Sequence, residues 1–442
     1  MRHNAHWVYE RCGREYLYAR PQSYARLIGC RCMFEDDFLP DVAALERALA
    51  YLGTHLGSNQ LTRPTEHELP TSWPHEETAS EEVIERLAPL VLDGAARLDQ
   101  PYAMAHMDPP TPWLTWVMAQ WNARLNQNLL HAGTSPAAAA IEARVMEWLA
   151  PCFGMSGGLM TSGSTLSNLT ALWAARERVG IRRVVASASA HISIAKSAKL
   201  LGLELFEIPS SQSGVLDIDA LPDNLDDAAL VLTAGTTGTG VIDPISGELN
   251  AAWRHVDAAW AGPLQFTQYA HRLAGIEQTD SVSVSAHKLL FQPKESALVM
   301  FREADASMGA IAMGSDYLTQ PNVGVQGSRG AAAIPLFATL LAWGKSGLAK
   351  RIEHCLNQAA LVADWVSAQP KLRLLCEPVS GVVVWRAERG ETDTLNLLDR
   401  LQTGAASRLT LNGETWVRQV AANPLLDSQS VINAIEQALK DR

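Results

Sequence analysis

The chain has 442 residues, 47% of them hydrophobic and 19% charged, and is therefore long enough to bury a large core in one big domain and one smaller one. Its net charge of −11 argues against nucleic acid as a partner, so we expect small molecules or a second copy of the chain to bind instead. The six cysteines lack the paired spacing of a metal site, which predicts reduced thiols, a cytoplasmic location and no bound metal.

The N-terminal part of the chain predicts helices. Residues 1–34 are basic and aromatic without a clear period, and they lack the apolar segment of a secretory signal. An amphipathic helix is expected over Leu39–Gly53, where leucines recur at helical spacing, and further helices over Glu81–Leu98 and Ser135–Ala150. We expect residues 1–100 to form an N-terminal helical segment.

The middle of the chain changes to short apolar runs separated by helices or turn-rich linkers. This alternation predicts an α/β fold with a mostly parallel sheet that helices cover on both faces. The expected strands are Arg183–Ala188, Ala229–Ala234, Trp253–Ala259, Ser281–Ser285 and Ala297–Phe301.

The C-terminal part predicts a small α+β domain over residues 344–442, after a large domain over residues 101–343. Its expected elements are a helix after Trp343, strands over Leu372–Leu375, Val382–Trp385 and Trp416–Val420, and a last helix over Ser428–Leu439. The most apolar stretch, Ala331–Trp343, is too short to span a bilayer, so we expect a buried helix and no membrane partner.

Three segments of the large domain carry small polar residues at element ends. Thr161–Asn168 opens a helix with free backbone N–H groups and could bind an anion, or could simply cap the helix. His191 lies between a strand and a helix, where it could serve a ligand or cap the helix. Thr233–Gly240 could let a ligand approach closely, or could form only a tight turn.

Two further strand ends carry charged side chains. Asp257 ends an apolar strand, and a buried carboxylate must be paired, because an isolated one is costly. Lys288 follows the alternating strand Ser281–Ser285, at the kind of strand end where open α/β sheets place their chemistry. Alone it could be a solvated strand terminus. An anion cradle, a carboxylate and an amine together meet the needs of pyridoxal phosphate, which requires a phosphate site, a partner for its ring nitrogen and a lysine.

The five segments resemble, in order, the pyridoxal-dependent group II amino acid decarboxylases, which include glutamate, aromatic amino acid, histidine and 2,4-diaminobutyrate decarboxylases. The resemblance runs from about His106 to the C-terminus. It implies a fold-type I large domain with a seven-stranded sheet, pyridoxal 5′-phosphate as cofactor, and an obligate homodimer with shared active sites. The segments are TSGSTLSNLTALWAARE, SAHISIAKSAKLLGL, TAGTTGTGVIDPI, HVDAAWAG and SVSVSAHKLL.

The resemblance also implies roles for individual residues. Lys288 would hold the cofactor as a Schiff base, Asp257 would pair with its ring nitrogen, and His191 would stack on the ring opposite Ala259. The remaining cofactor-binding residues would be Gly163, Ser164, Thr165, Thr233, Ser285 and His287. Ser164 and Ser285 depart from the glycine and the Asn or Asp that are usual in the family, which leaves cofactor binding intact and puts substrate identity in doubt.

Four residues outside these segments complete the expected site. Tyr317 would lie on a mobile loop, reach the partner's site and protonate the substrate carbanion, unless it is only a packing aromatic. His191 could help to return this proton instead. Ser328 and Arg329 would lie near the substrate at the dimer interface. Arg418 would bind the substrate carboxylate, with an ion pair as the alternative role.

These residues predict decarboxylation of an L-amino acid to its amine, with a diamino or acidic substrate such as 2,4-diaminobutyrate. An aromatic substrate stays open, because the chain has many tryptophans, including Trp113 and Trp116. An aminotransferase, an aldehyde synthase or a carbon–carbon lyase could use the same cofactor site. A non-catalytic homodimer is a further alternative, which Lys288, Asp257 and His191 argue against.

Overall fold

The computed structural model describes residues 41–55, 69, 71–131, 133–247 and 249–440. The expectation for residues 1–34 therefore lies outside the described residues. The described residues divide into two compact units, one that ends at residue 95 and one that begins at residue 96.

The first unit contains the helices α2 (Val42–His55) and α3 (Ser80–Ala88). Arg47 of α2 pairs with Glu81 of α3 at 3.7 Å. The expected long helix over residues 81–98 is wrong in its second half, because α3 ends at Ala88 and the π-helical turn η2 (Pro89–Asp93) follows. Pro89 has no backbone N–H to donate and cannot continue a regular helix, which explains the change.

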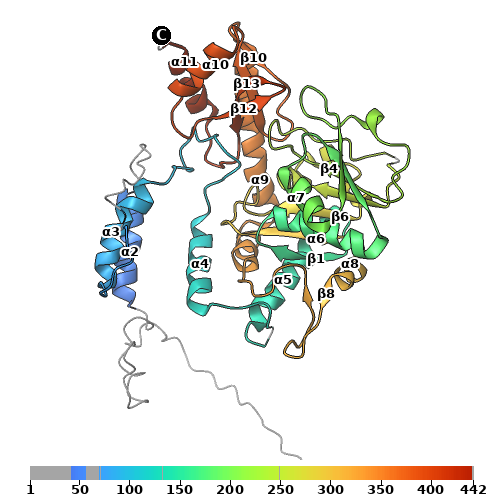
Figure 1. The fold of residues 1–442 in the computed structure, drawn as a ribbon. Helices are drawn as coiled ribbons and strands as arrows, with labels where there is room; N and C mark the ends of the chain where they lie inside the picture. The colour runs from blue at the N-terminus through green and yellow to red at the C-terminus, as the bar shows by residue number, and fades with distance from the viewer. Residues whose placement is uncertain (1–40, 56–68, 70, 132, 248, 441–442) are drawn as a thin grey trace, which may run out of the picture. The chain divides into compact units, whose positions relative to one another are not determined.

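The second unit is built on a seven-stranded sheet in the order β1-β7-β6-β5-β4-β2-β3. Every strand runs parallel to the others except β7, which pairs antiparallel with both β1 and β6. The mostly parallel seven-stranded sheet is therefore confirmed (Figure 1). Its strands are β1 (Gly157–Thr161), β2 (Arg183–Ser187), β3 (Glu204–Ile208), β4 (Ala228–Thr233), β5 (Trp253–Asp257), β6 (Ser281–Ser285) and β7 (Ala297–Phe301).

Successive strand residues point to opposite sides of this sheet. Apolar residues therefore lie on both faces, and helices cover both. Val231 packs with α6 (Ser164–Val179), α7 (Ile192–Leu201) and α8 (Ala304–Ala310) in one buried cluster. Leu230 and Leu232 pack in a second cluster that includes α5 (Pro136–Leu149) and α9 (Ala333–Ser367). The helix α4 (Trp113–Leu125) contacts α9.

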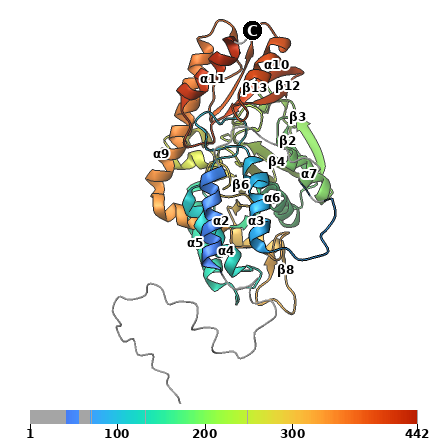
Figure 2. The ribbon, with the colours of Figure 1, turned by 90° about the vertical axis from the view of Figure 1, so that its left-hand side faces the viewer.

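The C-terminal elements form the predicted α+β arrangement at one end of the second unit (Figure 2). They follow α9, which is interrupted at Gly344, where the backbone adopts a φ of 59°. This break coincides with the predicted boundary between residues 343 and 344, and the division into two domains there stays a prediction. The elements are the sheet β10 (Leu372–Leu374), β11 (Val382–Ala387), β13 (Glu414–Val420), β12 (Ser407–Leu411), and the helices α10 (Glu391–Arg400) and α11 (Ser428–Lys440).

Two short strands, β8 (Ala312–Met313) and β9 (Asn322–Val323), form a separate hairpin. Across the part of the chain that the structure describes, no helix has the length and apolar character needed to cross a membrane.

Candidate active site

Three of the predicted cofactor residues, Thr233, Asp257 and Lys288, lie at or just beyond the carboxyl ends of the neighbouring strands β4, β5 and β6. Thr233 ends β4 and is in register with Asp257 at the end of β5, which is in register with Ser283 near the end of β6. Lys288 lies three residues beyond the end of β6, and its backbone N–H donates to Ser285 at 3.3 Å. The strand order therefore brings together residues that are up to 55 positions apart in the sequence.

The charges on Lys288, Asp257 and His191 act on one another in this site. Burial lowers the pKa of Lys288, and the Asp257 carboxylate opposes that effect. Burial also lowers the pKa of His191, with Asp257 again opposing and Lys288 adding to the decrease. The three side chains are thus close enough for their charges to interact, and the amine of Lys288 deprotonates more readily than a free lysine.

An anion cradle lies at the N-terminus of α6, where free N–H groups and the helix dipole favour negative charge. A Cβ placed on Gly163 would meet only His287 Cε1, at 3.9 Å, so the backbone there is open to a ligand. His287 Nδ1 is buried without a partner among the described residues. Burial lowers the pKa of His287 to about 4, so the ring is neutral at pH 7.

The two departures from the family pattern contact each other across this cradle. Ser164 Oγ and Ser285 Oγ are 2.6 Å apart and share a hydrogen bond. Each hydroxyl can still offer a lone pair or a proton to a phosphate oxygen. Thr165, the third predicted residue of the cradle, is exposed in the first turn of α6.

The two residues expected on either side of the cofactor ring are at least partly accessible. His191 is exposed, and Ala259 is half-buried. Thr233 Oγ1 is buried and, like His287 Nδ1, has no hydrogen-bond partner among the described residues. Because buried polar atoms without partners are rare in folded proteins, these two atoms fit a site completed by a polar ligand such as pyridoxal phosphate.

The sequence did not reveal the residues that hold Asp257. Asn168 of α6 donates from Nδ2 to Asp257 Oδ2 at 2.9 Å, and Ala259 N–H donates to Oδ1 at 3.1 Å. His255 and Ser283 contact the other end of Asn168. The signal that could have identified Ser283 is its position on a fully buried strand, where a hydroxyl needs a partner.

Arg418 lies on β13 and enters the site from the C-terminal sheet. Its Nε donates to Thr237 O at 2.8 Å, and its Nη1 contacts Ala105 O and Ser407 Oγ, both at 3.3 Å. Burial lowers the pKa of Arg418 to about 10, which the carboxylate of Asp108 opposes. Arg418 is thus a buried cation that bonds mainly to neutral carbonyls. Its positive charge is therefore available for the predicted binding of a carboxylate.

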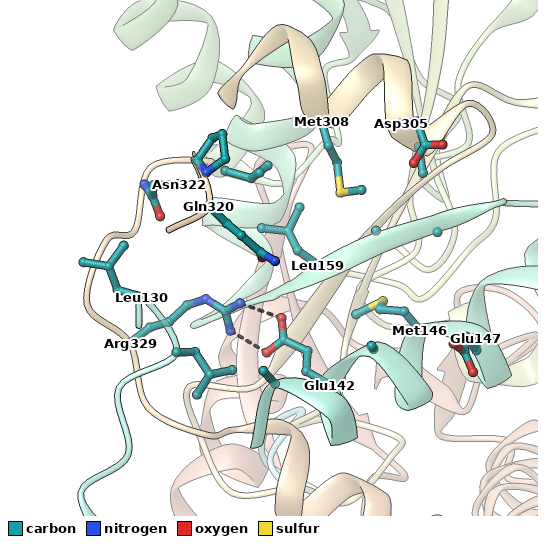
Figure 3. Close-up of a pocket in the computed structure, with 18 of the residues that line it drawn as sticks. Leu130, Glu142, Met146, Glu147, Leu159, Asp305, Met308, Gln320, Asn322 and Arg329 are labelled. Atoms are coloured by element: carbon teal, nitrogen blue, oxygen red, sulfur yellow. Dashed lines mark hydrogen bonds and ion pairs between the residues drawn. The ribbon is translucent and has the colours of Figure 1, made fainter. Parts of the chain in front are cut away.

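Ser328 and Arg329 form hydrogen bonds with side chains that were not among the predicted site residues. Arg329 forms a bidentate ion pair with Glu142 of α5, at 2.5 and 2.6 Å, in the wall of a pocket of about 440 Å³ (Figure 3). Ser328 accepts from Asn128 Nδ2 at 3.1 Å. Both residues also line a second pocket, of about 420 Å³, that includes Lys294 and Ser162. Ser162 directly precedes Gly163 of the cradle, and the role of Ser328 and Arg329 at the substrate stays a prediction.

Tyr317 lies between β8 and β9 and is 67% exposed. Its ring centroid is 6.1 Å from that of His131, and no contact with Lys288 is present among the described residues. The structure thus leaves this tyrosine at the surface of its own chain.

The fold and the site together define a class of protein, an α/β enzyme that binds pyridoxal phosphate at the carboxyl ends of its strands. The model of the pyridoxal-dependent decarboxylase conserved domain matches residues 63–388. The chain belongs to this family, and its reaction is the pyridoxal-phosphate-dependent decarboxylation of an amino acid, as the motifs indicate.

Curated relatives cover most of the chain. It is 32% identical to the L-2,4-diaminobutyrate decarboxylase of Rhizobium meliloti (strain 1021) over 377 residues, 75% of this chain and 76% of that protein. It is 25% identical to the L-2,4-diaminobutyrate decarboxylase of Acinetobacter baumannii, over 81% of this chain and 83% of that protein. Identity to the aspartate 1-decarboxylase of Aliivibrio fischeri (strain ATCC 700601 / ES114) is 28%, over 72% and 69% of the two chains.

Solved structures share the fold at low identity. The Oryza sativa TDC with PLP and tryptamine superimposes with a TM-score of 0.81 at 20% identity, covering 93% of this chain and 98% of that one. The glutamate decarboxylase domain of a Vibrio parahaemolyticus diaminobutyrate-pyruvate transaminase and L-2,4-diaminobutyrate decarboxylase gives 0.77 at 23%, covering 95% and 100%. These likenesses confirm the predicted fold class.

Proposed function

We propose that the substrate is L-2,4-diaminobutyrate, which the enzyme converts to 1,3-diaminopropane and carbon dioxide. Two relatives, each matched over at least three quarters of its own length, are named L-2,4-diaminobutyrate decarboxylase, which supports this choice. The observation that carries it in this chain is a carboxylate, Asp108, on the Lys288 side of the site. An additional carboxylate suits a substrate that has an additional ammonium group.

Asp108 comes from the loop that precedes α4, and this loop runs past Arg418. Ala105 N–H donates to Gly404 O at 2.9 Å, while Ala105 O accepts from Arg418. Asp108 itself pairs with Lys294, six residues beyond Lys288. Its charge opposes the burial-driven decrease in the pKa of Lys288, His287 and Arg418. In the proposed complex Arg418 binds the α-carboxylate of the substrate, and Asp108 binds the distal ammonium in place of Lys294.

The other proposed roles follow from the contacts above. Pyridoxal phosphate, when bound, supplies the electron sink for the pair released when the Cα–carboxylate bond breaks. Lys288 holds the cofactor aldehyde, and Asp257 keeps its ring nitrogen protonated. Gly163, Ser164, Thr165, Ser285 and His287 would hold the phosphate, and Thr233, Ala259 and His191 would bound the ring.

Replacing Asp108 with asparagine is expected to raise the KM for L-2,4-diaminobutyrate about 10- to 100-fold, because one charge-assisted hydrogen bond is lost. Turnover of L-2-aminobutyrate, which lacks the distal ammonium, should change less than about threefold, since no such bond is involved. Steady-state kinetics on both compounds measure the difference. Glu295→Gln is the matched control, because Glu295 is an exposed acid next to Lys294.

An aspartate substrate would give the opposite result. The side-chain carboxylate of aspartate is repelled by Asp108 and attracted by Lys294, so Asp108→Asn would then improve turnover of aspartate. That outcome would exclude the diamino substrate and favour the activity named for the Aliivibrio relative.

We further propose that the protein acts as a homodimer in the cytoplasm and that Tyr317 works in the partner's site. Two features support this. Tyr317 is exposed on a loop, and α4 exposes Trp113, Trp116 and Trp121 by 69%, 45% and 57%, a tryptophan-rich surface of the kind that partners cover. Unpaired thiols at Cys152, Cys355 and Cys376 suit a reducing compartment.

Replacing Tyr317 with phenylalanine is expected to lower the yield of amine and raise that of aldehyde. Without the phenolic proton donor, protonation at Cα would slow, and dioxygen and water would convert more of the decarboxylated substrate to aldehyde, ammonia and hydrogen peroxide. Chromatography of amine and aldehyde, with and without oxygen, measures the partition. An amine yield equal to that of the wild type would remove Tyr317 from the mechanism.

A further inference from the structure

A buried chain of hydrogen bonds runs between Trp253 and His191 and has Asn168 at its centre. All of its members except His191 are at most 3% exposed. Asn168 is the branch point, because its amide contacts four side chains from three different elements. Its members are Trp253, Ser281, His255, Asn168, Ser283, Asp257, Ser193 and His191.

The orientation of the Asn168 amide follows from its neighbours. Nδ2 lies 2.9 Å from Asp257 Oδ2, and a carboxylate can only accept, so this atom must be the NH₂ group. Oδ1 therefore accepts from Ser283 Oγ at 2.6 Å and from His255 Nε2 at 3.0 Å. Rotating the amide would place its oxygen against the carboxylate, which is repulsive.

The proton positions on His255 are then determined. Its Nε2 carries the proton that Asn168 accepts, and burial lowers the pKa of His255 to about 4, so the ring is neutral. Its Nδ1 must accept from Ser281 Oγ at 2.8 Å, and Ser281 in turn accepts from Trp253 Nε1–H at 2.8 Å. Every bond on this side donates toward Asn168.

The second branch determines the proton on His191. Asn168 Nδ2 also donates to Ser193 Oγ at 2.9 Å. Ser193 N–H donates to His191 Nδ1 at 3.2 Å, and Ser193 Oγ lies 2.8 Å from the same nitrogen. His191 Nδ1 is thus an acceptor, and the proton of the neutral ring is on Nε2.

We infer that Asn168 is a positioning residue that orients the Asp257 carboxylate and, through Ser193, holds His191 in its Nε2–H form. One amide thereby orients both the Asp257 carboxylate, which is proposed to pair with the cofactor ring nitrogen, and the His191 imidazole, which is proposed to face the ring. This inference rests on the proposed roles of Asp257 and His191. Its test uses cofactor retention, which does not depend on the identity of the substrate.

The test compares substitutions that separate hydrogen bonding from packing. Asn168→Asp keeps the size of the side chain but turns the donor into an acceptor facing Asp257. Asn168→Ala removes both the hydrogen bonds and the packing of the side chain. Dissociation of pyridoxal phosphate from diluted holoenzyme, followed by absorbance, should be fastest in Asn168→Asp, slower in Asn168→Ala and slowest in the wild type. We expect Asn168→Asp to exceed the wild-type rate at least about tenfold, the effect of one buried charged hydrogen bond.

Ser193→Ala isolates the second branch. It leaves the bond between Asn168 and Asp257 intact, so cofactor dissociation should stay within about threefold of wild type while kcat decreases about tenfold, as for a misplaced catalytic group. Ser197→Ala is the matched control, because Ser197 is a second buried serine of α7 whose hydroxyl has no hydrogen-bond partner among the described residues. We expect it to match the wild type in both measurements.

Three results would overturn the inference: wild-type retention in Asn168→Asp, faster loss from Asn168→Ala than from Asn168→Asp, or an unchanged kcat in Ser193→Ala. If Asn168→Asp does not fold, Asn168→Leu replaces it and must lose the cofactor at least as fast as Asn168→Ala. A wild-type protein that binds no pyridoxal phosphate would instead contradict the proposed function.

Discussion

Replacing Lys288 with alanine is expected to lower turnover at least about a thousandfold, because no other amine can take its place as the covalent anchor and proton carrier. Among the described lysines, the nearby Lys294 is exposed and paired with Asp108, so it cannot substitute. Carbon dioxide release and the visible absorbance of the bound cofactor measure the effect together. Lys199→Ala removes an exposed lysine of α7 and serves as the control.

The absorbance and the rate should disappear together in Lys288→Ala. A variant that kept both would show that another residue binds the cofactor, and the assignment of the whole site would then be wrong. Wild-type turnover and absorbance in Lys199→Ala would exclude a general effect of lost positive charge.

Replacing Asp257 with asparagine is expected to lower kcat/KM about a hundred- to a thousandfold, the range seen when one electrostatic partner of the transition state is lost. The reason is local. An asparagine amide cannot accept at both positions where Ala259 N–H and Asn168 Nδ2 now donate, so its NH₂ would face another donor. It also carries no charge to keep the ring nitrogen of the cofactor protonated.

Kinetics and cofactor affinity together measure the Asp257→Asn variant. We expect cofactor affinity to decrease as well as turnover. Asp305→Asn, on α8, is the control for loss of one carboxylate elsewhere. Turnover within about threefold of wild type in Asp257→Asn would mean that the carboxylate does not act on the transition state.

The sequence predicted the central strands well because each is a short apolar or alternating run. The bounds of β6 and β7 agree with the expected ones, and every residue of both strands is buried. The two strands of the seven-stranded sheet that were not predicted lie at its edges. β3 is mostly exposed and carries Glu204 and Glu207, while β1 begins with two glycines, so neither shows a strand pattern.

The candidate site was partly predictable for a related reason. Lys288, Asp257 and Thr233 each lie at or just beyond a strand end, where the chain pattern itself indicates a site. Asn168 lies within a helix, and its role depends on contacts with residues 25 to 115 positions away, which no local pattern encodes. Asp108 is likewise brought near Lys288 and Arg418 by a loop whose path is determined by contacts with the C-terminal sheet.

Two predicted residues have other partners within one chain, His131 for Tyr317 and Glu142 for Arg329. Tyr317 is exposed between β8 and β9, and Arg329 is neutralised by Glu142. The resemblance implies that both act at an active site shared between two subunits. A single chain cannot show such a site, because the partner's residues are missing from it. Their roles therefore depend on the proposed dimer.

The measurement that tests the central claim most directly is release of carbon dioxide and amine from a panel of L-amino acids with added pyridoxal phosphate. The panel contains diaminobutyrate, ornithine, lysine, glutamate, aspartate and the aromatic amino acids. We predict that L-2,4-diaminobutyrate gives the highest kcat/KM and yields 1,3-diaminopropane and carbon dioxide in equal amounts. A protein that binds the cofactor yet releases no carbon dioxide from any of these amino acids would contradict the account, and transamination and aldehyde formation would then be tested.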